Sequence, residues 1–401
     1  MMQKLQCNFL ISFIMLAMVL TPFHEKVKTQ TGSPAIDLSK YNSISNTIDS
    51  LNYLIDKENQ EVLLISNDIK KLKTSRINLS KECSSIQKES LGISKDSLKK
   101  SNTNCDSLTH LLKILDKKIK DDSAEIGKYN KSIRKNKEKV ALNTTQLNNE
   151  SKVIISAAKN CNGSLHFVFK GINYNVFIAN TMSNEIKMYW QNKNKRNYAS
   201  IGKLLDHLKE QKIAPLMITN AGMYSPTLQP QGLFIEQYEL LKPLDLRSPK
   251  TDANFYLKPN GVYFIDSLGV SHIKTSEDFQ KIVESKNVVV KYATQSGPML
   301  LTDGKIHPSF TRQSNNKKIR SGVGIINENL TVFAISLGET NFYDFALLFK
   351  DIFGCKDALF LDGAISKMYL DIAPKELGGQ FGALISVLPK KETHSKLDKK
   401  R

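Results

Sequence analysis

Polar side chains that could bind or activate a substrate follow apolar runs at several places in the second half of the chain. Asp362 comes directly after the fully apolar 359–361, and Gln295 lies a few residues after the apolar 288–290. A run that is apolar at every position is typical of a strand buried on both faces, and the end of such a strand often carries a binding or catalytic group. These patterns predict a polar site that suits an anionic substrate. Four clusters of this kind occur, at 219–224, 258–264, 295–297 with Arg320, and 362–363.

Each cluster also has a purely structural interpretation. Asn260 and Asp362 each precede a glycine, and Asn-Gly and Asp-Gly are common tight-turn dipeptides. Asp344 stands three residues after Asn341, where the acid of a capping box would lie. Arg320 ends a basic loop and could simply be solvated. Residue spacing alone therefore leaves a functional site and a series of turns as alternatives.

Short alternating runs predict the elements that position these clusters. The period changes from helical to strand-like near residue 152, and strands outnumber helices in an irregular order, which favours an α+β domain with a mixed sheet over 152–390. About 235 residues suffice for one core. The predicted strands are 164–170, 174–179, 215–219, 261–265, 288–294, 321–326, 330–336 and 357–361, and the predicted helices are 201–208, 279–283 and 341–353. Thr275 with Asp278 can cap the helix over 279–283.

Residues 37–150 have the apolar spacing of a coiled-coil stalk. Apolar residues recur at alternating steps of four and three from Ile48 to Ile93, and again from Leu108 to Val140. The break near Gly92 fits either a stutter in one long rod or the turn of an antiparallel helical hairpin; we favour the rod. We expect the stalk to make the protein a homo-oligomer, with a generic spacer as the alternative.

The N-terminal residues 1–22 have the features of a signal peptide or membrane anchor. The apolar run 9–20 is short for a membrane span and fits the central region of a signal peptide. A clear small-residue cleavage site does not follow it, so an uncleaved anchor remains an alternative. We expect export, to the periplasm or the cell surface.

Charge and cysteine content narrow the possible partners. Lys+Arg 57 against Asp+Glu 39 gives a net charge of +18, which favours polyanionic surroundings. Much of the excess is scattered lysine in 66–140 and in the basic tail 391–401, and the chain contains no recognisable nucleic-acid-binding module, so we expect no nucleic acid partner. The five cysteines and the histidines form no metal-ligand spacing. No metal and no cofactor are expected.

Six motifs, in order, resemble the phosphodiester glycosidase family, in particular the bacterial relatives of the lysosomal uncovering enzyme, N-acetylglucosamine-1-phosphodiester α-N-acetylglucosaminidase. The resemblance covers roughly residues 160–390 and none of the stalk. The motifs are Asn220-Ala-Gly-Met-Tyr224, Lys258-Pro-Asn-Gly-Val-Tyr-Phe264, Ala293-Thr-Gln-Ser-Gly-Pro-Met-Leu300, Ile319-Arg-Ser-Gly-Val-Gly324, Asn341-Phe-Tyr-Asp-Phe-Ala346 and Leu359-Phe-Leu-Asp-Gly363.

The resemblance implies hydrolysis of the bond between the anomeric carbon of a sugar and a phosphodiester. On its motif positions, Asp362 is the candidate base or nucleophile and Arg320 the candidate phosphate clamp. Asn220 completes the candidate catalytic set. The candidate substrate-binding residues, which would orient sugar hydroxyls and phosphate or allow close backbone approach, are Gly222, Asn260, Gln295, Ser296, Gly297 and Gly363.

We therefore expect an exported hydrolase that cleaves a sugar-1-phosphodiester in envelope or exopolysaccharide glycans. The alternative is a non-catalytic protein that binds phosphoglycans, or an envelope scaffold, presented on the coiled coil. The segments 219–224 and 363–369 contain no second acidic residue to pair with Asp362. A mechanism with two carboxylates would have to recruit Glu236, Glu339 or Asp344.

Overall fold

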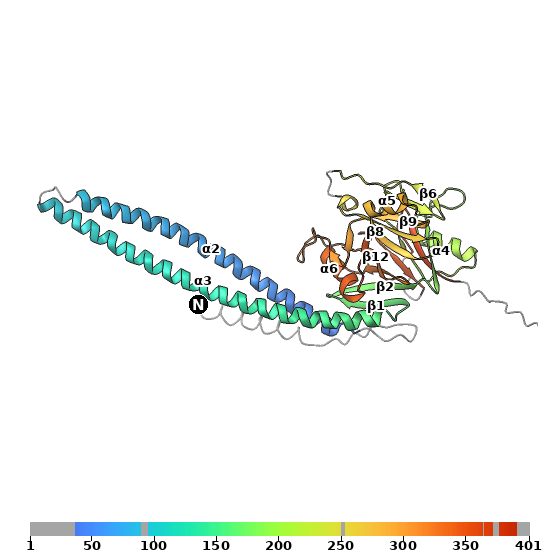
Figure 1. Ribbon diagram of the computed structural model, residues 1–401, viewed down its shortest axis with the longest axis horizontal. Coiled ribbons are helices and arrows are strands. Elements are labelled where there is room, and N and C mark those ends of the chain that lie inside the picture. The colour runs from blue at the N-terminus through green and yellow to red at the C-terminus, as the bar shows by residue number, and fades with distance from the viewer. Residues whose placement is uncertain (1–36, 90–94, 250–252, 364, 372–376, 391–401) are drawn as a thin grey trace, which may run out of the picture. The chain divides into compact units, whose positions relative to one another are not determined.

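The computed structural model describes residues 37–89, 95–249, 253–363, 365–371 and 377–390 (Figure 1). The expected signal peptide or anchor at 1–22 and the basic tail at 391–401 lie outside these residues. Within the described ranges, no helix combines the length and the apolar character that crossing a membrane requires. The chain divides into two compact units, a helical unit of Ser43–Leu147 and a sheet unit that combines Met1–Asn42 with Asn148–Arg401.

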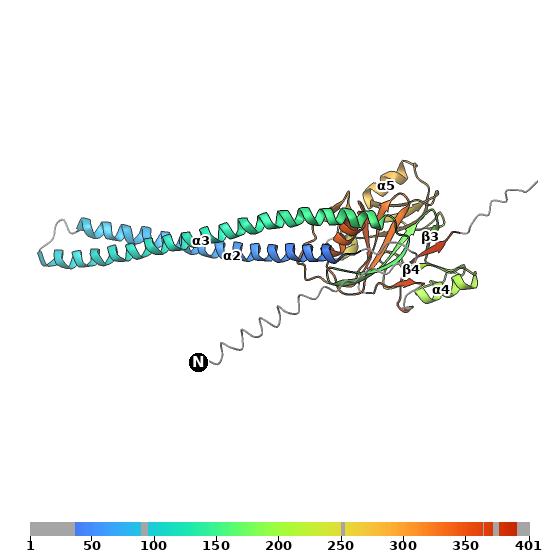
Figure 2. The same ribbon diagram turned by 90° about the horizontal axis from the view of Figure 1, so that it is seen from below.

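Two long helices, α2 (Ser39–Glu89) and α3 (Lys95–Ala158), form the helical unit and extend into the sheet unit. Ser132 donates a hydrogen bond to Glu58 (2.6 Å), and Arg76 pairs with Asp116 (2.5 Å). The later residue of α2, Arg76, contacts the earlier residue of α3, Asp116, so the two helices run antiparallel, as Figure 2 shows. The expectation of a single rod is wrong.

The hairpin satisfies the apolar spacing of both helices within one chain. Seam residues of each helix are buried, among them Ile48, Ile55, Ile69 and Ile133. An apolar stripe needs a facing surface, and here the other helix of the hairpin supplies it. Coiled-coil packing and assembly of several copies both stay predictions.

The first residues of α2 belong to the sheet unit. The Tyr41 hydroxyl donates to the Asp351 carboxylate (2.6 Å), and the Tyr41 ring lies 5.6 Å from the ring of Phe169. Asn42 donates to the carbonyl of Val168 and accepts from the amide of Lys170, both at 3.1 Å. The sheet unit therefore includes residues well before the expected boundary at 152.

Three antiparallel sheets build the sheet unit. The first has the order β1 (Gly163–Phe169), β2 (Ile172–Asn180), β13 (Leu330–Ser336), β12 (Ser321–Asn327), β14 (Ala358–Asp362), β10 (Met299–Thr302), β11 (Lys305–Ile306). The second is β15 (Met368–Leu370), β4 (Met217–Asn220), β16 (Leu384–Pro389), β3 (Asn184–Tyr189), and the third is β6 (Glu239–Lys242), β5 (Phe234–Glu236), β9 (Val290–Ser296), β7 (Gly261–Asp266), β8 (Ser271–Thr275). The prediction of an α+β domain is confirmed, because the unit contains both helices and antiparallel sheets. The prediction of a mixed sheet is wrong, because every ladder among the described strands is antiparallel.

One apolar core lies between the inner faces of the three sheets. It joins, among others, Leu359 and Val323 of the first sheet, Met217 and Ile385 of the second, and Tyr263 of the third. Because all three sheets share this core, their strand ends are held in fixed positions relative to one another.

Helices cover the outer faces of the sheets. α4 (Ile201–Glu210) packs on the second sheet and α5 (Ser276–Glu284) on the third. α6 (Phe342–Leu347) continues as a π-helix (Leu348–Ile352) against the first sheet, where Phe345 and Phe349 lie next to Gly322. The predicted N-cap of α5 is confirmed, since Thr275 accepts from the amide of Asp278 (3.1 Å).

We predict that Tyr41→Ala lowers the free energy of unfolding of the sheet unit by about 3 kcal/mol, because it leaves a cavity and removes the partner of a buried carboxylate. Urea unfolding followed by the fluorescence of Trp190, the only tryptophan of the chain and buried in the shared core, measures this directly. The matched control is Tyr238→Ala, at a tyrosine 54% exposed in the same unit. Equal losses in the two variants would contradict the prediction.

Candidate active site

Asp362 ends β14 and lies opposite Ser321 of β12 in the ladder. Its Oδ1 atom accepts a hydrogen bond from the amide of Gly363 (2.7 Å). Burial raises the pKa of Asp362 to about 6, although the Gly363 amide acts in the opposite direction. Asp362 therefore gains and loses its proton close to neutral pH, as a general base requires.

Polar groups from the first and second sheets meet beside Asp362. Asn220, at the end of β4, donates through Nδ2 to the Ser321 hydroxyl (3.0 Å), which lies 2.8 Å from the Ser366 hydroxyl. The Oδ1 atom of Asn220 accepts from the amide of Lys367 (3.3 Å). Asn220 thus fixes both the Ser321 side chain and the loop that follows Asp362.

The third sheet reaches the same place through the end of β9. The Ser296 hydroxyl donates to the carbonyl of Leu361 (2.7 Å), directly before Asp362. The amide of Gly222 donates to the Thr294 hydroxyl (3.2 Å), and a Cβ atom at Gly222 would collide with the carbonyl of Gln295. Of the candidates, Asn220, Gly222, Ser296, Asp362 and Gly363 are therefore brought together where the three sheets meet.

Arg320 lies apart from this group. Its guanidinium donates to the carbonyls of Thr340 and Asn316, both at 2.8 Å, and lies 3.5 Å from the ring centroid of Phe342. Adjacent residues of an extended strand point to opposite faces, so the Ser321 side chain faces the site while Arg320 faces α6. In this structure Arg320 holds two loops together.

Gln295, Asn260 and Gly297 form a second group that supports the protein backbone. Gln295 accepts from the amides of Leu233 (3.0 Å) and Asp245 (2.9 Å) and donates to the Asp245 carbonyl (2.7 Å) and the Ser276 hydroxyl (2.9 Å). Asn260 donates to the carbonyl of Phe255 (2.9 Å), and a Cβ atom at Gly297 would lie 2.6 Å from that of Asn260. All four polar contacts of the Gln295 amide are made within the protein.

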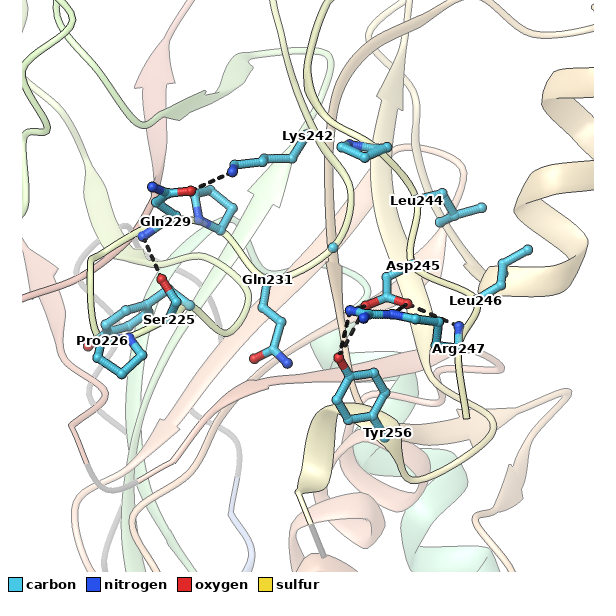
Figure 3. Close-up of a pocket in the computed structure, with 14 residues that line it drawn as sticks. Ser225, Pro226, Gln229, Gln231, Lys242, Leu244, Asp245, Leu246, Arg247 and Tyr256 are labelled. Atoms are coloured by element: carbon cyan, nitrogen blue, oxygen red, sulfur yellow. Dashed lines mark hydrogen bonds and ion pairs between the residues drawn. The ribbon is translucent and has the colours of Figure 1, made fainter. Parts of the chain in front are cut away.

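A cavity of about 730 Å³ opens between the two segments that Gln295 joins. In Figure 3, Ser225, Pro226 and Gln229 form one side, Leu244 to Arg247 with Tyr256 form the other, and Gln231 lies between them. Its charged lining residues are Lys242, Asp245 and Arg247. The guanidinium of Arg247 pairs with both oxygens of Asp245 (3.0 and 2.7 Å), which holds the pKa of Asp245 below its usual range.

Tyr224 connects this cavity to Asp362. Tyr224 lines the cavity, and its hydroxyl donates to the carbonyl of Gln380. Burial raises the pKa of Tyr224 to about 12, and the negative charge of Asp362 contributes to the same shift. The loop that leaves β4 at Asn220 therefore passes Asp362 and then forms one wall of the cavity.

Several residues of this region escape an interpretation based on sequence alone. Ser321 lies inside the family motif 319–324, and strand alternation favours it over its neighbour Arg320 as the side chain that faces the site. Ser366 and the segment 242–247 belong to no motif, so only the tertiary structure reveals them. Two of the three acids named above as possible second carboxylates have partners of their own. Asp344 pairs with Lys170 (2.9 Å), and Glu236 accepts from the amide of Trp190 (3.2 Å).

Residues 215–381 match the family model described as phosphodiester glycosidase. The uncharacterized protein YigE of Escherichia coli (strain K12) is 35% identical over 199 residues, which are 48% of this chain and 73% of YigE. The chain belongs to the phosphodiester glycosidase family. All nine candidate residues fall inside the segment that matches this glycosidase family, whereas α2 and α3 lie outside it.

We predict that Asp362→Asn stabilises the protein above pH 6 by about 3 kcal/mol, a gain that disappears below pH 4. A raised pKa means that the folded state binds the proton more tightly than the unfolded state. Ionising Asp362 between pH 4 and 6 therefore costs stability, and asparagine avoids this cost. Urea unfolding across pH tests it, with Asp371→Asn, at an exposed carboxylate, as the control. A gain that does not depend on pH would contradict it.

We also predict that Gln295→Ala lowers the free energy of unfolding by at least about 3 kcal/mol, because it leaves buried backbone groups without partners. The matched control is Gln211→Ala, at an exposed glutamine of the same unit, which should cost much less. Urea unfolding of the two variants gives the comparison. An equal cost at the two positions would show that these contacts do not hold the cavity walls.

Proposed function

We propose that this protein is an exported glycosidase that hydrolyses a sugar-1-phosphodiester in envelope or exopolysaccharide glycans. Membership of the glycosidase family supports the class of reaction. The observation that carries the proposal is the buried carboxyl of Asp362, with its pKa raised to about 6, opposite Ser321, to which Asn220 donates. The loop after Asn220 leads to Tyr224 in the wall of a cavity with cationic groups. Substrate charge and catalytic group would then lie in neighbouring parts of one site.

In the proposed step a water molecule attacks the anomeric carbon. The Asp362 carboxylate takes a proton from this water as the new carbon–oxygen bond forms. The bond from the anomeric carbon to the bridging oxygen breaks, and its electron pair leaves with the phosphate. The products are a free sugar and a phosphate monoester, and Asp362 later returns its proton to solvent.

The leaving group explains why one carboxylate can suffice. A phosphate monoester has a second pKa of about 6, so it leaves as an anion without a strong general acid. The cavity supplies cations for that charge. Lys242 donates to the neutral amide of Gln229 rather than to a carboxylate, which leaves its charge available for phosphate oxygens.

The proposal also assigns roles to the helical unit and to the expected signal peptide or anchor. Export would follow from the expected signal peptide or anchor at 1–22. The helical hairpin would present the glycosidase unit to glycans of the envelope, and self-association through its exposed surfaces would give a homo-oligomer. Phosphorylated glycans, and not nucleic acid, are the partners that the basic charge and the family favour.

We predict that Asp362→Asn lowers kcat for sugar release by about 10²–10⁴-fold. Wild-type kcat should rise with pH through about 6, because the base must be ionised. The control is Asp357→Asn, which makes the same change just before the other end of β14. The assay measures free sugar released from a panel of sugar-1-phosphodiesters.

The same panel separates hydrolysis from binding. Wild-type protein that retains these diesters on a column yet releases no sugar would favour the non-catalytic phosphoglycan binder. Full activity in the Asp362→Asn variant would remove Asp362 from the mechanism.

A further inference from the structure

The cavity beside Tyr224 has two chemically different parts. Among the described residues of its lining, the charged ones are Lys242, Asp245 and Arg247, which sum to one net positive charge. A phosphodiester carries one negative charge, so a single such group would neutralise the cavity. Arg247 is already paired with Asp245. The unmatched cation is therefore Lys242.

The rest of the cavity wall is mostly apolar. Three prolines, two leucines and the rings of Tyr224 and Tyr256 line it, namely Pro226, Pro230, Pro243, Leu244 and Leu246 with the two tyrosines. A cavity of 300–1,000 Å³ with apolar walls and few polar groups is typical of a site for a small organic ligand. A purely hydrophilic glycan would leave most of this wall without a matching surface.

The apolar wall continues beyond the cavity. Leu244 and Ile235 both pack at the margin of the cluster under α5. Leu240 lies opposite Ile235 in the ladder between β5 and β6, and so on the same face, with 61% of its surface exposed. Leu240 therefore extends the outer apolar face of the third sheet past Ile235, and Leu244 of the cavity wall packs on the same cluster.

We propose that this cavity holds the leaving group of the substrate and that this group is the phosphate of an apolar alcohol. The inference rests on the proposed function and names its substrate class, a glycosyl phosphate of a lipid-like alcohol. The sugar lies toward Asp362, the phosphate contacts Lys242, and the hydrocarbon lies along Leu244 and Leu246 toward Leu240. Tyr224 separates the sugar from the hydrocarbon.

The molecule contains its own reporter for this site. The Nζ atom of Lys242 lies 5.8 Å from the ring centroid of Trp190, whose indole donates to the Leu228 carbonyl in the loop of the cavity wall (3.1 Å). Trp190 is the only tryptophan of the chain. A ligand that displaces Lys242 or this loop will change its fluorescence.

The test is a titration of the full-length protein with inorganic phosphate, ethyl phosphate, butyl phosphate and octyl phosphate, followed by Trp190 fluorescence and by calorimetry. These compounds represent the leaving group, so the measurement needs no turnover. Each methylene that enters the cavity should tighten Kd about 4-fold. Lys242→Gln should weaken all four by a similar factor, about 10-fold, whereas Leu246→Ser should reduce only the dependence on chain length.

Matched controls make the same changes elsewhere on the third sheet. Leu268→Ser alters a leucine that is 85% exposed in the β7–β8 turn, and Lys274→Gln alters an exposed lysine of β8. Both should bind like wild type. A Kd that does not change with chain length, an unchanged dependence in Leu246→Ser, or no binding of any alkyl phosphate would overturn the inference. Release of sugar from a glycerol-linked diester that requires Asp362 would in that case still support the proposed hydrolase.

Discussion

The antiparallel pairing of β12 with β14 is the constraint on which the candidate site depends. It places Ser321 opposite Asp362 at the edge of the shared core. A shift of one residue in this ladder would turn the Ser321 side chain away and bring Arg320 toward the site. The apolar residues that both strands bury fix the register, so core packing determines which polar residue faces the candidate site.

The site is rigid because its polar groups already have partners. Among the described residues, the buried side-chain atoms that lack a hydrogen-bond partner are in Glu58 and Tyr174, both outside the site. Asn220, Ser321 and Ser366 form a connected network around Asp362, and such a network holds its members in one arrangement. Burial then raises the pKa of Asp362.

Gln295 and Arg320 show that a polar residue in a family motif can hold backbone segments together. Gln295 joins the two walls of the cavity, and Arg320 joins two loops beside α6. Both side chains satisfy buried backbone groups, which would otherwise destabilise the fold. The charged residues that line the cavity, Lys242 and Arg247 among them, come from a segment without a motif.

Local patterns in the sequence determined the elements of this protein. Apolar spacing predicts the long helices and most strands near the site, the capping residues predict the start of α5, and the motifs identify the family and the carboxylate at the end of β14. Each of these features depends on residues close together in the chain. The sequence could not decide between a rod and a hairpin, because the same apolar seam can pack against another chain or against a second helix of its own.

Only the tertiary structure decided which side chains share the site. The distribution of strands among three sheets brings Asn220, Ser296 and Asp362 together, and it places the Gln295, Asn260 and Arg320 side chains against partners within the protein. The tertiary structure also creates the cavity between two segments that the buried side-chain amide of Gln295 joins. These outcomes depend on contacts between residues far apart in sequence, and spacing along a single chain carries no direct information about such contacts.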